Sequence, residues 1–294
     1  MRRINLMRTT TVLLSMMLGL SPCQGRNRKN LLSERIGVCT GVSNADAVKK
    51  AGGHHIELGL SSFANPDKDE AKFDEDLQEA LSCGLPTCST NGFFPGSIKV
   101  TGPKADHERA VQYTETALRR AHEAGIKVCV LGSAGSRNIP DGFPRQEAEA
   151  QFVELLRKLA PIARKYDIVI AIEPLQKSES NFINTVQEGY EIARKVNHPS
   201  VGVNADIFHM LREGESPQSL LNAGRRYIRN VHIAEAANRT APGVEGDDFT
   251  PYFEALRAIK YQGNISIECG WSDFQKQVGP AIAEVKRQLQ SVGF

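Results

Sequence analysis

Short apolar runs that end on an acid or an imidazole mark the second half of this chain. Residues 168–172 are uncharged and mostly β-branched, the pattern of a strand buried on both faces, and Glu173 follows them directly. Pro174 then prevents further sheet pairing through its own amide. Later apolar runs end in the same way on Asp206, His232 and Glu268. Because an isolated buried charge is costly, these four side chains need ion pairs, hydrogen bonds or a metal ion.

Strand and helix patterns alternate along the chain from residue 34 onward. Strands are expected at 35–40, 55–58, 85–91, 126–131, 168–172, 201–205, 230–231 and 265–267. Helical segments are expected to begin near residues 44, 74, 106, 145, 185, 217, 252 and 274. No shift in composition interrupts this alternation. It predicts an α/β fold, a single-domain (β/α)8 TIM barrel spanning residues 34–294.

Length and charge are consistent with one barrel. The chain has 294 residues, 40% of them hydrophobic, and a formal net charge of +2. A typical barrel of this type needs about 250 residues. The balanced charge argues against a nucleic-acid or acidic partner, and no apolar run reaches the roughly 18 residues that span a bilayer.

The N-terminus has the pattern of an export signal. Three arginines within the first eight residues precede the uncharged segment 9–20, so residues 1–23 are expected to be a signal peptide. The segment 20–23 resembles a bacterial lipobox, with Pro22 as a departure and Cys23 as the residue to be lipidated. Residues 24–33 are interpreted as a polar tether. The protein is therefore expected to be exported, either periplasmic or anchored to the membrane as a lipoprotein, with a plain cleaved signal as the alternative.

The residues that end the late strands form a candidate metal site. Strand carboxyl ends form the active face of a (β/α)8 barrel, so these side chains should converge although they lie far apart in sequence. Three carboxylates and one imidazole favour Mn²⁺, Mg²⁺ or Co²⁺, with Zn²⁺ as an alternative. Salt bridging or helix capping remains the alternative for each residue taken alone. The candidate ligands are Glu173, Asp206, His232 and Glu268.

Longer motifs around these residues carry a resemblance to a known family. They are Glu173-Pro-Leu followed by Glu179 and Asn184-Thr185, Asp206-Ile-Phe-His209, His232-Ile-Ala-Glu235 followed by Arg239, and Ile267-Glu268-Cys-Gly. Over residues 35–290 the chain resembles the xylose isomerase-like TIM-barrel superfamily of sugar isomerases and epimerases. The similarity is greatest to its ketose 3-epimerase and hydroxypyruvate isomerase branch. The spacing from His232 to Arg239 is one residue longer than usual.

The resemblance implies a chemistry as well as a fold. One divalent ion, with Mn²⁺ preferred, is expected on the four ligands. Glu173 and Glu268 are expected to transfer the proton next to a sugar carbonyl through a cis-enediolate. The expected substrate contacts are His209, Arg239, Glu179 and Glu57. For Glu57 a bond to a neighbouring strand-end group is the alternative, and Arg137 is either a sugar or anion contact or a surface residue.

Other functions use related sites. The same proton abstraction ends in β-elimination in a lyase acting on 3-keto-sugars or keto-glycosides. An abasic-site endonuclease needs further His/Asp ligands and a basic groove, which the sequence lacks, and a non-catalytic sugar-binding lipoprotein has no need for two opposed carboxylates. A free ketose or keto-sugar is the expected substrate because no Gly-rich phosphate loop is present. Association into homo-oligomers is left open.

Overall fold

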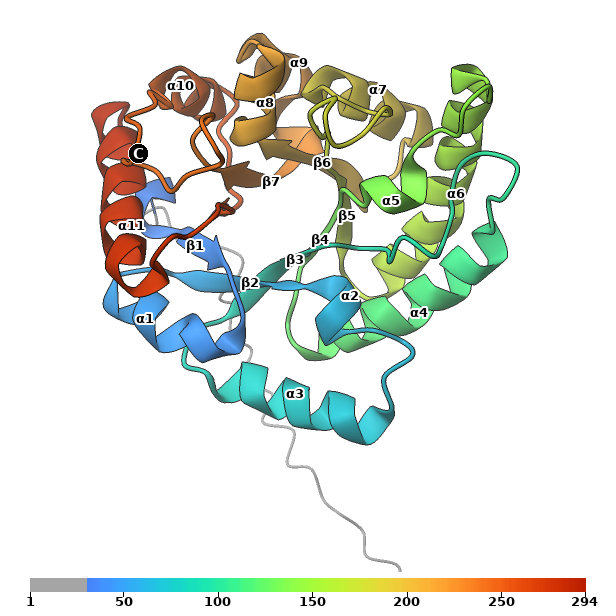
Figure 1. Ribbon diagram of the computed structural model, residues 1–294, viewed down its shortest axis with the longest axis horizontal. Coiled ribbons are helices and arrows are strands. Elements are labelled where there is room, and N and C mark those ends of the chain that lie inside the picture. The colour runs from blue at the N-terminus through green and yellow to red at the C-terminus, as the bar shows by residue number, and fades with distance from the viewer. Residues whose placement is uncertain (1–30) are drawn as a thin grey trace, which may run out of the picture.

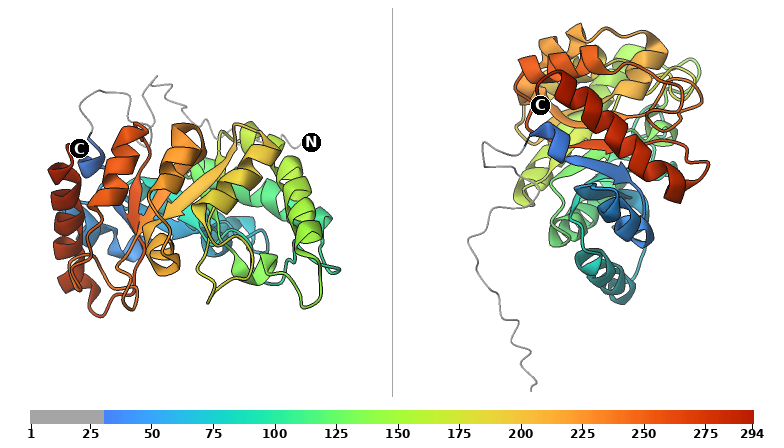
Figure 2. Two further views of the ribbon diagram at one scale, coloured as in Figure 1. Left: turned by 90° about the horizontal axis from the view of Figure 1, so that it is seen from above. Right: turned by 90° about the vertical axis from the view of Figure 1, so that its left-hand side faces the viewer.

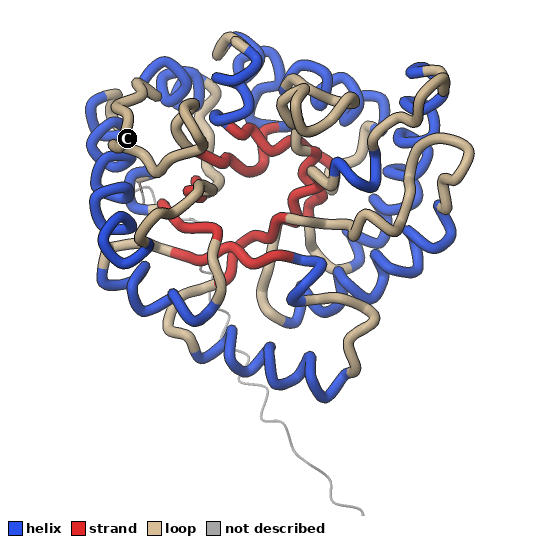
Figure 3. The backbone as a smooth tube through the Cα atoms, in the orientation of Figure 1, coloured by secondary structure: helices blue, strands red, loops and turns tan. Residues whose placement is uncertain are grey.

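A closed barrel of eight parallel strands, surrounded by helices, forms the whole of the described structure (Figures 1 and 3). The computed structural model describes residues 31–294. This architecture confirms the prediction of a single-domain (β/α)8 barrel. The expected signal peptide and most of the expected tether lie outside the described residues.

The strands pair in sequence order, and the last one closes the ring on the first. Val38, for example, lies opposite Ile56 of the second strand and Ile267 of the eighth. Asp206 and His232 are register partners on neighbouring strands, which brings two candidate ligands together. The strands are β1 (Ile36–Cys39), β2 (His55–Gly59), β3 (Thr87–Asn91), β4 (Val128–Leu131), β5 (Val169–Ile172), β6 (Val201–Asp206), β7 (Ile228–Ile233) and β8 (Ile265–Ile267).

Within residues 31–294, eight helices cover the barrel, as the alternation predicts. They are α1 (Ala45–Lys50), α3 (Glu70–Ser82), α4 (His107–Glu123), α6 (Arg145–Lys165), α7 (Val186–Val196), α9 (Gln218–Tyr227), α10 (Thr250–Ala258) and α11 (Phe274–Ser291). Helix α3 begins four residues earlier than expected because the Asp69 side chain accepts a hydrogen bond from the Lys72 amide and caps it.

Short helical turns were missed by the sequence pattern, because one or two turns are too short to show a helical period. They are η1 (Leu32–Glu34), η2 (Val42–Asn44), α2 (Leu60–Phe63), α5 (Ala134–Arg137) and α8 (Ile207–Glu213). In η1, Leu32 is buried and the Ser33 hydroxyl donates to the Phe294 carbonyl at 3.2 Å. Leu32 and Ser33, which the sequence pattern assigned to the tether, thus pack against the barrel domain.

The two ends of the described chain pack side by side. Helix α11 contacts η1, α1 and β1, and the side view of Figure 2 shows it lying along the first strand. The apolar core fills the space between the barrel and its helices. Within residues 31–294, no helix is both long enough and apolar enough to cross a bilayer.

Candidate metal centre

The four predicted ligands converge at the carboxyl ends of β5, β6, β7 and β8. One ligand atom from each of Glu173, Asp206, His232 and Glu268 lies within 4.8 Å of the others. The Nδ1 atom of His232 is 3.0 Å from a Glu173 carboxylate oxygen and 3.1 Å from one of Glu268. All but Glu268 are almost fully buried. The structure therefore brings together residues separated by up to 95 positions in the chain.

The second nitrogen of the His232 ring, Nε2, is hydrogen-bonded to Glu57. The Nε2 atom lies 2.8 Å from Glu57 Oε1, and the other Glu57 oxygen accepts hydrogen bonds from the hydroxyls of Ser89 (2.6 Å) and Ser266 (2.7 Å). A carboxylate that accepts from one ring nitrogen fixes the tautomer and leaves the other nitrogen to bind metal. Glu57 thus contacts neighbouring strand-end groups, the second of the two alternatives that the sequence left open.

Charge and burial shift the pKa values of these groups in different directions. Burial, reinforced by the nearby Glu268 carboxylate, raises the pKa of Glu173. Burial would also raise the pKa of Glu268, but His232 and Arg239 hold it far below its usual range. Burial alone would lower the pKa of His232, yet Glu57 and Glu268 raise it well above 6.5. The two glutamates thus occupy electrostatically different positions.

The donor set fits a divalent metal ion. Three carboxylates lie close together at the centre, and the positive charges of His232, Arg239 and Arg137 offset only part of their mutual repulsion. Oxygen-rich sets of this kind with one imidazole suit Mn²⁺, Mg²⁺ or Co²⁺ better than a thiolate-preferring ion. A centre of this composition, with its histidine braced by a carboxylate, is consistent with a metal site rather than with a set of structural salt bridges.

His209 points an unsatisfied nitrogen towards the centre. Its Nδ1 accepts a hydrogen bond from the Gln176 amide at 3.1 Å, so the neutral ring carries its proton on Nε2. That Nε2 is buried, has no hydrogen-bond partner within residues 31–294 and lies 3.6 Å from Asp206 Oδ2. An unpartnered buried donor beside the ligands is suited to a substrate oxygen.

Arg239 reaches the centre despite the longer spacing after His232. Its Nη2 lies 2.7 Å from Glu268 and 3.4 Å from Asp206, and its guanidinium lies over the Phe208 ring at 4.6 Å. Glu179 lies further out, 3.8 Å from Arg239 Nη1, and is 38% exposed. The structure thus places Arg239 against two ligands and Glu179 at the rim.

Arg137 is not a surface residue. Its guanidinium is fully buried and donates to the Leu131 carbonyl at 3.1 Å and to the Ile183 carbonyl at 3.4 Å. Burial lowers its pKa to about 10, and the negative charge of Glu173 opposes that shift. The surface alternative is therefore wrong, because the short helix α5, which follows β4, directs this side chain into the interior.

A buried carboxylate organises the loop that carries Arg239. Glu235 accepts hydrogen bonds from the amides of Gly243 (2.7 Å) and Gly246 (2.9 Å) and from the Thr240 hydroxyl (3.1 Å). The loop turns through Arg239 itself, which has a left-handed φ of 53°. The hydrogen bonds to Glu235 therefore fix the conformation of the loop that carries Arg239.

Glu235→Gln should destabilise this loop, because the NH₂ group of glutamine would face backbone amides that are themselves hydrogen-bond donors. Losing charge-assisted hydrogen bonds costs about 1.5–3 kcal/mol, so the midpoint of thermal unfolding should fall by roughly 5 °C. The KM for a sugar substrate should rise more than kcat falls, since Arg239 is displaced without loss of a ligand. The control is Glu245→Gln, an exposed acid of the same loop. Equal melting and KM values for both variants would show that Glu235 does not position Arg239.

Several polar residues around the ligands were missed by sequence reasoning. Asn91 donates to Glu268 at 2.6 Å, and Asn204 donates to Glu173 at 2.8 Å. A sequence signal for them exists, because a polar residue at or next to a strand end is preceded, two positions earlier on the same face of the strand, by a second polar residue. The pairs are Ser89 and Asn91, Asn204 and Asp206, Asn230 and His232, and Ser266 and Glu268.

Fold and centre together define a class: a (β/α)8 barrel with a candidate metal centre at the carboxyl ends of its last four strands. The family model described as "Xylose isomerase-like TIM barrel" matches residues 45–291. The chain therefore belongs to the xylose isomerase-like TIM-barrel family, as the motifs predicted.

Two relatives of the chain are, by name, sugar epimerases. The chain is 33% identical over 153 residues to an L-ribulose 3-epimerase of Methylomonas sp., a match covering 52% of this chain and 51% of that relative. It is 29% identical over 223 residues to a 3-dehydro-D-guloside 4-epimerase of Escherichia coli, covering 72% of this chain and 83% of the relative. The chain thus spans about half the length of the first relative and most of the second. These names support the expected isomerase class.

Solved structures show the same fold. The structure of a 3-keto-D-glucoside 4-epimerase from E. coli superposes with a TM-score of 0.73 at 22% sequence identity, covering 86% of this chain and 98% of that one. At this level of identity the comparison concerns the fold alone.

Proposed function

We propose that this protein is a metal-dependent sugar isomerase or epimerase that acts on an unphosphorylated ketose or keto-sugar. The observation that carries the proposal is the convergence of Glu173, Asp206, His232 and Glu268 within 4.8 Å, with both glutamates against the same imidazole nitrogen. The epimerase names of the relatives support the same reaction class. Mn²⁺ is the metal we expect, because the donors are mostly carboxylate oxygens.

The residues of this chain divide the chemistry between them. When bound, a divalent ion polarises the sugar carbonyl and lowers the cost of negative charge beside it. One of Glu173 and Glu268 removes the proton from the carbon next to the carbonyl, and the other returns a proton to the resulting cis-enediolate. The Nε2–H of His209 and the Arg239 guanidinium orient the sugar oxygens. Glu57 holds His232 in the orientation that keeps Nδ1 directed at the centre.

The proposal is tested by the reaction products formed in D₂O. A panel of ketoses and 3-keto-glycosides is incubated with the manganese-loaded protein and followed by NMR. Deuterium should enter the carbon next to the carbonyl, and an epimer or isomer should accumulate. An unsaturated product would assign the β-elimination alternative to the same site. Absence of both exchange and product across the panel would refute the proposal.

We also propose that the protein is exported, on the strength of the N-terminal pattern alone. Intact-mass measurement of the protein from a membrane fraction tests this. A first residue at Cys23 carrying a lipid supports the anchor, whereas an unprocessed N-terminus contradicts export.

A further inference from the structure

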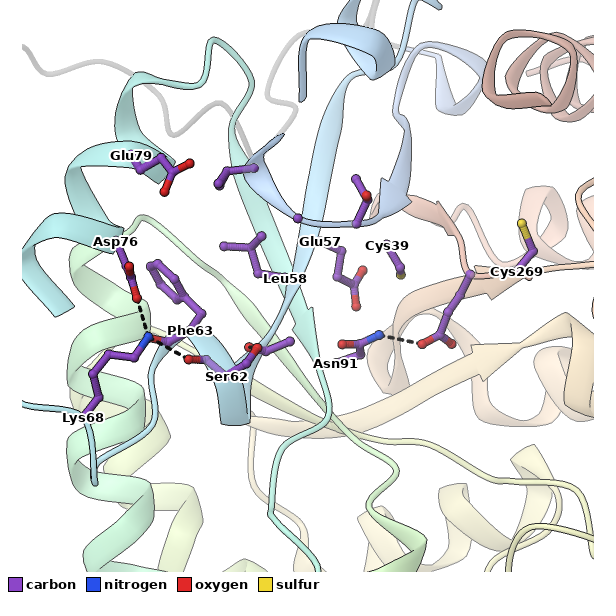
Figure 4. Close-up of a pocket in the computed structure, with 15 residues that line it drawn as sticks. Cys39, Glu57, Leu58, Ser62, Phe63, Lys68, Asp76, Glu79, Asn91 and Cys269 are labelled. Carbon is purple, nitrogen blue, oxygen red and sulfur yellow. Dashed lines mark hydrogen bonds and ion pairs between the residues drawn. The ribbon is translucent and has the colours of Figure 1, made fainter. Parts of the chain in front are cut away.

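A side pocket of about 500 Å³ opens next to the metal centre, between the ends of β1 and β2 and the helices α2 and α3 (Figure 4). Its size lies within the roughly 300–1,000 Å³ range of small-molecule sites. Of its lining, the sequence motifs include only Glu268 and Cys269, and the proton-transfer scheme above uses only its inner end.

The inner end of the pocket is part of the catalytic centre. Glu268 and Asn91 line it, joined by a 2.6 Å hydrogen bond between the Asn91 amide and the carboxylate. A substrate whose reacting carbon lies against Glu268 therefore has this pocket within reach of its remaining part. The pocket leads away from the ligands towards α3, where Asp76 and Glu79 form its outer wall.

The walls combine apolar surface with hydrogen-bonding groups. Leu58 and the Phe63 ring form one side, and the Ser62 hydroxyl lies beside them (Figure 4). A sugar ring has this mixed character, because its C–H faces pack on apolar and aromatic side chains while its hydroxyls donate to carboxylates and hydroxyls.

The charge of the pocket disfavours an anionic ligand. Lys68 is its one cation among the lining residues, and all three of its donors are used, by Asp76 and by the carbonyls of Ser62 (2.8 Å) and Phe63 (3.3 Å). Glu79 forms no ion pair within residues 31–294. With Lys68 and Asp76 cancelling each other, the wall is left net negative, so a phosphate or carboxylate group is repelled.

We propose that this pocket is a subsite for a second, uncharged sugar ring, so that the preferred substrate is a keto-sugar with a glycosidic substituent rather than a free or phosphorylated ketose. This inference rests on the proposed function, since it places the reacting ring at Glu268. The reacting ring occupies the metal centre, and the substituent ring lies between Phe63 and the carboxylates of α3.

The test is direct binding, which needs no turnover. Dissociation constants of the manganese-loaded full chain are measured by calorimetry for maltose, cellobiose, methyl α-glucoside and methyl β-glucoside. At least one disaccharide should bind about tenfold or more tightly than its methyl glycoside, the gain of two or three added hydrogen bonds and apolar contacts. Maltose 6′-phosphate should bind more weakly than maltose.

Glu79→Trp, which fills the outer end of the pocket, should abolish this preference. The matched control is Asp74→Trp, which removes an equal charge from an exposed position of the same helix that does not line the pocket. The inference is overturned if neither disaccharide binds more tightly than its methyl glycoside, or if both variants keep the preference. Absence of deuterium exchange from any ketone, with the binding preference intact, would instead refute the proposed function and leave the subsite standing.

Discussion

Glu173→Gln and Glu268→Gln should each lower turnover by about 10²–10⁴-fold, the usual cost of losing one general base. Glutamine keeps the shape of the side chain and one oxygen for the metal but cannot accept the proton. The two carboxylates lie 3.0 Å and 3.1 Å from one imidazole nitrogen but come from different strand ends, so neither can replace the other without a change of position.

Measuring bound metal distinguishes a variant that has lost only its general base from one that no longer binds the metal ion. Each variant is analysed for bound metal and for folding by circular dichroism, beside Glu147→Gln, an exposed acid at the start of α6. With metal retained, solvent deuterium should enter the substrate in the wild type and in at most one variant, the one that retains the general base for the first half of the reaction and lacks the acid for the second half. If both variants turn over at near wild-type rates with metal bound, the base must be sought among Glu57, Glu179 and His209.

Gly132→Ala should disrupt the centre by steric contact alone. A Cβ at this position would lie 2.2 Å from the Glu173 carboxylate oxygen Oε2. Glu173 is buried and its other oxygen is held by Asn204 and His232, so the carboxylate has little room to move aside. We expect metal affinity to fall by about 10–100-fold, as when a supporting contact of a ligand is lost, and turnover to fall with it.

Metal titration of the Gly132→Ala protein measures this effect. The control is Gly279→Ala in α11, where an added Cβ meets no atom within 4 Å and should stabilise slightly. Wild-type metal affinity in Gly132→Ala would show that Glu173 is not a ligand in the position described here.

The fold was predictable because each strand and helix carries its own signal. Residues 168–172 form a strand in the structure almost as their pattern requires, and α6 begins at the predicted residue 145. The short helix α8 was not predictable in this way. It forms directly after β6, where the Asp206 carboxylate accepts a hydrogen bond from the Phe208 amide at 2.9 Å. A candidate ligand thus also acts as a helix cap.

The ligands were predictable for a simple reason, whereas their surroundings were not. An acid that follows an apolar strand can be recognised from the sequence alone, and closure of the barrel then brings the ends of such strands together. The contact between Glu57 and His232 joins residues 175 positions apart and depends on which way two side chains turn inside the barrel. The same holds for Arg137, whose loop composition suggests exposure although its guanidinium is buried.

Metal content of the wild type and of Asp206→Ala tests the central claim most directly. Asp206 also caps α8, so the matched control is Asp69→Ala, which removes the cap of α3 far from the centre at a similar cost of about 1 kcal/mol. Elemental analysis of protein prepared without chelator should find one divalent ion per chain in the wild type and in Asp69→Ala, and almost none in Asp206→Ala. Equal metal content in wild type and Asp206→Ala, or no metal in either, would contradict the assignment of these four residues as a metal centre.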